Sequence, residues 1–110
     1  MAILSRKPAY ESLEALLLEV DRRHEAARDG YKYDFDSEIA PFLNDNKDMV
    51  DNIKMYDTDQ RFNAVTRDKM IEELMELLMS CHAGRSSMKA YKEKYKFVNM
   101  WVRHIKKEGL

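Results

Sequence analysis

The chain has few of the residues that interrupt helices. Its 110 residues include only three glycines and two prolines. Glycine readily adopts conformations that end a helix, and proline is tolerated mainly near a helix start. These residues stand at Pro8, Gly30, Pro41, Gly84 and Gly109. The stretches between them are long enough for helices, so their placement predicts an all-α protein.

Cysteine and long apolar runs are also scarce. The single cysteine, Cys81, excludes an internal disulfide and is typical of a reducing compartment. The apolar run Leu16–Leu18 near the N-terminus is too short for a signal peptide or a membrane span. We therefore expect a cytoplasmic protein with no membrane partner.

The chain also has no marked excess of acidic or basic residues. The chain has 19 basic and 20 acidic side chains, which gives a net charge of −1. No overall field then draws the protein to nucleic acid or to an anionic membrane. The length predicts a single domain over residues 1–110, large enough to bury roughly two-thirds of its unfolded surface.

Apolar residues at helical spacing predict four helices, over residues 8–29, 41–56, 66–83 and 86–107. Pro41 predicts that the second helix either starts there or is kinked there, and Asp34, Asp36 and Ser37 are alternative N-caps for it. Gly30 and Gly84 are the expected stop signals of the first and third helices. Short connections place successive helices antiparallel, so we expect an up-down-up-down antiparallel four-helix bundle.

The helical wheel also predicts which side chains are buried. Leu18 lies outside the buried face of the first helix, and we expect it to pack under the following loop. Asn46 lies within the apolar face of the second helix, and we expect it to bond a backbone group near residues 33–35. The predicted buried faces comprise Tyr10, Leu13, Leu16, Leu17, Val20, His24 and Ala27, then Phe42, Leu43, Met49, Val50, Ile53 and Tyr56, then Met70, Ile71, Leu74, Met75, Leu77, Leu78 and Cys81, and finally Met88, Tyr91, Tyr95, Val98, Trp101, Val102 and Ile105.

The segment from residue 33 to residue 46 carries a motif. It reads Y-D-F-x3-I-x-P-x4-N and is formed by Tyr33, Asp34, Phe35, Ile39, Pro41 and Asn46. This pattern resembles the YppE-like family of small cytosolic proteins from Bacillus and related Gram-positive bacteria. Weaker likeness continues at Glu76-Leu77, Tyr91-Lys92 and residues 105–108, and Ile53 replaces a tryptophan of the family. The resemblance implies a four-helix bundle in a family with no established activity, so it transfers no catalytic residues.

The three histidines are candidate metal ligands. A di-iron bundle needs two Glu-x-x-His motifs, but the residues three before His24, His82 and His104 are Asp21, Met79 and Trp101. Helix lengths place His104 roughly 25 Å from the other two histidines. The remaining candidate is a polar cluster at one end of the bundle, formed by His24, His82, Tyr33 and Asp34. It is either a metal or proton site or a pair of structural histidines, and we favour the second interpretation without a metal or cofactor.

The fourth helix has a basic face. Lys92, Lys96, Arg103 and Lys107 share it, and residues 85–108 carry a net charge of +6 against −6 for residues 34–59. This face is a candidate surface for an anion or a partner. It lacks base-stacking aromatics, which argues against nucleic acid. We favour the simpler interpretation that the basic face balances the acidic segment within the bundle.

These patterns predict a small, non-enzymatic protein-interaction module that binds an unknown protein partner and is itself a monomer or a weak homodimer. Two alternatives stay open. One is nucleic-acid or anionic-ligand binding through the basic face of the fourth helix. The other is a metal-dependent bundle enzyme that uses the end containing His24 and His82.

Overall fold

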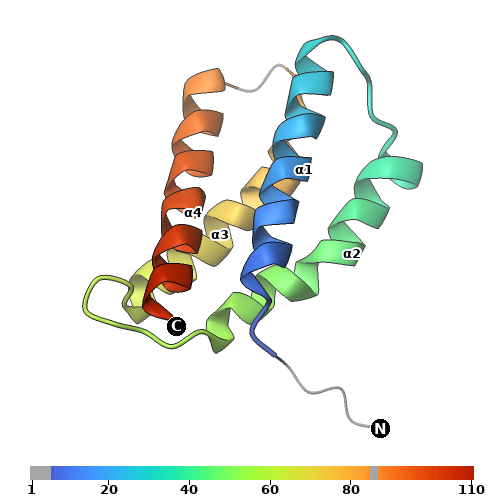
Figure 1. Cartoon of the computed structure of the whole chain (residues 1–110). Coiled ribbons are helices and arrows are strands. Elements are labelled where there is room, and N and C mark those ends of the chain that lie inside the picture. The colour runs from blue at the N-terminus through green and yellow to red at the C-terminus, as the bar shows by residue number, and fades with distance from the viewer. Residues whose placement is uncertain (1–5, 85–86) are drawn as a thin grey trace, which may run out of the picture.

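The computed structural model describes residues 6–84 and 87–110, and this part of the chain is helical without any strand. Figure 1 shows α1 and α4 side by side, with α3 passing behind them and α2 on the other side of α1. The four α-helices are α1 (Tyr10–Arg28), α2 (Ala40–Asp51), α3 (Ala64–Ser80) and α4 (Met88–Glu108). The expected all-α class with four helices is therefore confirmed.

Side-chain caps explain where α3 and α4 begin. Asn63 accepts from the Thr66 amide and starts α3 earlier than the predicted residue 66. Ser87 accepts from the Ala90 amide and starts α4, as expected for one of the two serines, while Ser86 lies outside the described residues.

The two stop signals act differently. Gly30 follows α1 at φ 107°, and hydrogen bonds from Gly30 and Tyr31 to Ala27 and Ala26 close the helix in a Schellman motif. Gly84 does not end α3, which stops at Ser80. Its lack of a side chain instead allows a close approach, because a Cβ there would lie 2.3 Å from the Ala27 carbonyl oxygen.

The second helix has three parts. Asp34 caps a short π-helical turn, η1 (Phe35–Ile39), which leads directly into α2 with Pro41 in its first turn. A 3-10 turn, η2 (Asn52–Met55), follows. Of the three N-caps considered, Asp34 is thus the one in use. The expected bond from Asn46 to the segment 33–35 is wrong, because its amide donates to the Phe42 carbonyl of its own helix at 2.8 Å.

The helices bury their predicted faces in one core. α4 packs against α1 and α3, whereas α2 packs against α3. The side chains on all four predicted faces are buried or half-buried. Two positions differ from expectation. Phe62, in the connection before α3, is completely buried, and Leu18 is 71% exposed rather than covered by a loop.

Candidate functional site

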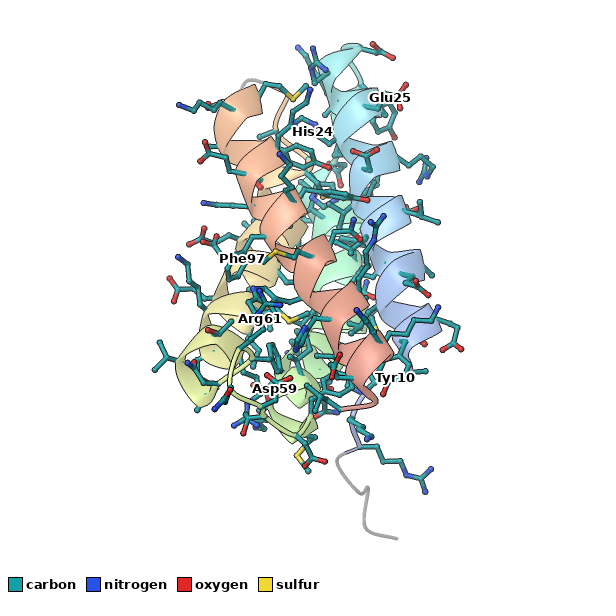
Figure 2. The ribbon with its side chains drawn as sticks, turned by 60° about the vertical axis from the view of Figure 1, so that its left-hand side comes forward. Tyr10, His24, Glu25, Asp59, Arg61 and Phe97 are labelled. Carbon is teal, nitrogen blue, oxygen red and sulfur yellow. The ribbon has the colours of Figure 1, made fainter. Side chains whose placement is uncertain are left out.

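A groove of about 600 Å³ lies between α1 and α4. Its volume is in the range typical of ligand sites in proteins, about 300–1,000 Å³. The last three turns of α1 form one wall and the first three turns of α4 form the other. Figure 2 shows His24 between these two helices, whereas Asp59 and Arg61 lie toward the opposite end of α4.

Aromatic rings form the floor of the groove. The rings of His24 and Tyr91 stack at a centroid distance of 3.6 Å, nearly parallel. The Tyr91 hydroxyl donates to Asp21 at 3.0 Å, and the Tyr95 hydroxyl donates to the Leu17 carbonyl at 3.2 Å. Burial and the nearby Asp21 carboxylate raise the pKa of Tyr91. Both tyrosines are therefore bonded to α1, and they stay protonated at neutral pH because burial also raises the pKa of Tyr95.

His24, which is part of this floor, has an unsatisfied polar atom. The side chain is only 2% exposed, and its Nε2 has no hydrogen-bond partner within the described residues. Burial lowers the pKa of His24, and the positive charge of Arg28 lowers it further. The imidazole is thus held neutral, because a buried charge without a partner would cost much more than a buried neutral ring.

The walls of the groove carry opposite charge. Asp21, Glu25 and Asp29 line it from α1, and Lys92 and Lys96 line it from α4. Arg28 is the one cation on the α1 wall. No described ion pair joins these walls. The α1–α4 ion pair that is seen, Glu14 with Lys106 at 3.3 Å, lies outside the groove.

Residues from two separate predictions line the groove. His24 belongs to the predicted polar cluster, and Lys92 and Lys96 belong to the predicted basic face, yet all three line the same groove. The basic face itself is divided, because Lys107 lines a different hollow of about 390 Å³ and Arg103 lines neither. A helical wheel of α4 alone cannot reveal this, since it contains no information about the helix opposite.

His82 lies in a different environment from His24. Its Nε2 is 2.9 Å from Arg23 Nη1, so it accepts from the guanidinium. Arg23 also stacks over the Phe42 ring at 4.1 Å and bonds Glu19 at 2.7 Å. Burial, and after it the adjacent Arg23 charge, lower the pKa of His82. His82 is therefore a neutral acceptor that ties α1 to the end of α3.

The predicted polar cluster is only partly assembled. Tyr33 contacts His82 edge to face at 4.8 Å, but no described ring contact or hydrogen bond joins His82 to His24. Asp34 is exposed and bonds the Ser37 amide and hydroxyl. Its role is the cap of η1, and hydrogen bonding by Ser37 lowers its pKa.

The observed ion pairs do not connect the basic face to residues 34–59, although their opposite charges were expected to balance. Lys94 pairs with Glu73 and Glu76 of α3, and Lys106 pairs with Glu14 of α1. None of Lys92, Lys96, Arg103 and Lys107 has an ion-pair partner within the described residues. The reason is the helix arrangement, because α4 packs on α1 and α3 while α2 lies against α3.

A side chain of α4 outside the basic face does reach the acidic segment. His104 Nε2 lies 2.7 Å from Asp59 Oδ2, and Asp59 Oδ1 accepts from the Phe62 amide. These bonds lower the pKa of Asp59. The arrangement holds the loop so that Phe62 reaches the core beside Trp101. Sequence reasoning missed it, although an aspartate three residues before a phenylalanine is compatible with such a turn.

Two features are absent from the part of the chain that the structure describes. No group of three or more histidine, cysteine, aspartate or glutamate side chains lies close enough to hold a metal ion. Within the same residues, no helix combines the length and apolar character needed to cross a membrane.

Comparison with known proteins gives no match to a family model, to a curated protein or to a solved structure. The resemblance of residues 33–46 to the YppE-like family thus stays a prediction from the motif.

Proposed function

We propose that the protein is a small, cytoplasmic, non-enzymatic interaction module that binds a partner polypeptide in the α1–α4 groove. The observation that carries the proposal is the pair of oppositely charged walls above an aromatic floor. Asp21, Glu25 and Asp29 face Lys92 and Lys96 across a space in which no described ion pair forms. A polypeptide with side chains of both signs satisfies both walls at once.

The charge pattern favours a polypeptide over nucleic acid. A phosphate chain near Lys92 and Lys96 would also approach three carboxylates on the opposite wall. That repulsion offsets the attraction on which sequence-independent nucleic-acid binding depends. The tyrosines of the floor are bonded to α1 rather than free to stack on bases.

The chemistry of the buried groups supports a non-enzymatic role. Burial raises the pKa of the Cys81 thiol to about 12, so very little of the thiolate nucleophile is present at neutral pH. His82 accepts from Arg23, which occupies its Nε2. His24 stacks beneath Tyr91 and is almost completely covered.

Peptide selection tests the proposal. Random peptides displayed on phage are selected against the immobilised protein, and the selected peptides are mapped by NMR chemical-shift changes. We expect sequences of mixed charge that perturb the α1–α4 groove. The variant Lys92→Gln/Lys96→Gln should weaken their binding at least about tenfold, which corresponds to about 1.4 kcal/mol.

The matched control removes the same charge elsewhere. Lys32 and Lys47 are exposed and lie outside the groove, so Lys32→Gln/Lys47→Gln should leave the affinity unchanged. Selected peptides that bind another surface, or equal losses in the two variants, would contradict the proposal.

We also propose the up-down-up-down antiparallel order for the helices. Two contacts support it: the Lys7 ammonium donates to the carbonyl of Leu110, and Gly84 lies against Ala27. The first contact joins the residues just before α1 to the last residue of the chain, and the second joins the end of α1 to the segment after α3, as this order requires. Distances between spin labels at the helix ends test the order, and a long distance between labels at residues 11 and 108 would contradict it.

A further inference from the structure

The face that contains the groove is complementary to itself. Its acidic wall comes from the α1 side, where three carboxylates outnumber the single cation Arg28, and its basic wall comes from α4. If a second copy is turned by a two-fold rotation about an axis parallel to these helices, its α1 faces the first copy's α4, and its α4 faces the first copy's α1. Each acidic wall then meets a basic wall, and both contacts are equivalent, as in an isologous dimer.

We propose that a second copy of this chain occupies this face, as a weak two-fold dimer in which the α1 wall of each copy contacts the α4 wall of the other. The inference rests on the proposed interaction function and names the partner. The principal contacts are made by Glu25 and Asp29 of one copy with Lys92 and Lys96 of the other.

An exposed apolar side chain lies in the same row as the acidic wall. Leu18 is 71% exposed and stands three residues before Asp21 and seven before Glu25, which places it on the same face of α1. The preceding residue, Leu17, accepts a hydrogen bond from Tyr95, so Leu18 is level with the lower part of the groove. In the dimer this side chain lies at the edge of the contact, where its removal from water adds to the electrostatic attraction.

The charge of the whole chain permits such an association. With 19 basic and 20 acidic side chains, two copies experience almost no net repulsion. The attraction is local and electrostatic, and the charges involved are exposed. Salt therefore screens it, and the dimer weakens as the ionic strength rises.

Two charge-reversal variants provide a sharp test. In Lys92→Glu/Lys96→Glu both walls are acidic, and in Glu25→Lys/Asp29→Lys both walls are basic. Each variant repels its own copies at both contacts. In an equimolar mixture, however, the acidic walls of one variant face the basic walls of the other, so both contacts become attractive.

Sedimentation equilibrium measures the outcome. We expect the parent to dimerise reversibly, with a dissociation constant that rises at least about tenfold between about 50 mM and about 500 mM NaCl. Each reversed variant alone should be monomeric, and the mixture should form a heterodimer. The control Lys32→Glu/Lys47→Glu should dimerise like the parent, and circular dichroism verifies that every variant is helical.

Several results would overturn the inference. They are a parent that stays monomeric at about 1 mM protein in low salt, reversed variants that dimerise like the parent, or a mixture that stays monomeric. Peptide selection separates this failure from failure of the proposed function. If the parent is monomeric but its groove still binds selected peptides, only the dimer is contradicted. If the parent is dimeric but selects no groove-binding peptide, the wider partner-binding role is contradicted.

Discussion

The two buried histidines differ in what surrounds their ring nitrogens. His82 accepts from Arg23 at 2.9 Å, whereas His24 Nε2 has no partner in the described part of the chain. Both rings are almost completely covered, and burial lowers the pKa of each below its ordinary value of 6.5. At the residue scale, one histidine is a structural acceptor and the other is an unsatisfied group in the floor of the groove.

The first prediction concerns pH. The unfolded chain takes up protons on both histidines below about pH 6.5, while the folded chain resists this because their pKa values are lowered. The unfolded state then binds more protons, so the free energy of unfolding should be highest above pH 6.5 and fall as the pH drops below it. Urea unfolding between pH 8 and pH 5 measures this slope.

Substitution of each histidine provides the control. His24→Phe keeps a ring in the stack and removes the unpaired atom, so it should reduce the slope and change stability at pH 8 by less than about 1 kcal/mol. His82→Phe also reduces the slope, but it deprives Arg23 of an acceptor and should cost about 1–3 kcal/mol at pH 8. Equal stability of these two variants would contradict the assigned roles.

At the element scale, Arg23 connects α1 to three other segments. It bonds Glu19 within α1, donates to His82 beyond α3, and stacks over Phe42 of α2. It also reaches the Glu38 carbonyl in η1 at 3.5 Å. The planar guanidinium suits this combination, because it can donate in its plane while its face lies on a ring.

The second prediction follows from that geometry. Arg23→Lys keeps the charge but loses the fork and the stacking face, so it should lower the free energy of unfolding by about 1–2 kcal/mol and speed amide hydrogen exchange in η1. Arg22→Lys is the matched control: Arg22 also bonds Glu19, but its side chain is 64% exposed. We expect that control to change stability by less than about 0.5 kcal/mol. Similar rates of amide hydrogen exchange in η1 of the two variants would contradict the connecting role of Arg23.

The third prediction concerns the contact between the end of α1 and the segment after α3. In Gly84→Ala the new Cβ would lie 2.3 Å from the Ala27 carbonyl oxygen and 2.7 Å from its carbon. Backbone atoms cannot move aside as a flexible side chain can, so we expect a loss of about 2–3 kcal/mol in thermal or urea unfolding. Gly109 has a positive φ of 69°, and a Cβ added there would have no atom within 4 Å. In Gly109→Ala, backbone strain alone should therefore lower the free energy of unfolding by about 1 kcal/mol. A larger loss at Gly109 would contradict the steric role of Gly84.

At the scale of the whole molecule, the sequence predicted each helix better than it predicted which other segments that helix contacts. Periodicity identified the buried face of each helix, since burial of one stripe depends on the helix itself. Phe62 and the groove were missed because both depend on contacts between distant segments. His24 and Lys92 were assigned to separate candidate sites for the same reason: only the packing of α1 on α4 brings them together.

The last prediction concerns the charge of the basic face. The four-fold variant with glutamine at Lys92, Lys96, Arg103 and Lys107 should change the free energy of unfolding by less than about 1 kcal/mol, because these side chains are exposed and have no described ion-pair partner. The parent should bind DNA and RNA weakly or not at all at about 150 mM salt, since carboxylates line the opposite wall of the groove. Fluorescence anisotropy with labelled oligonucleotides, measured over a range of salt, tests this. Micromolar binding that the four-fold variant loses, with a salt dependence that flattens as each charge is removed, would instead support the nucleic-acid alternative.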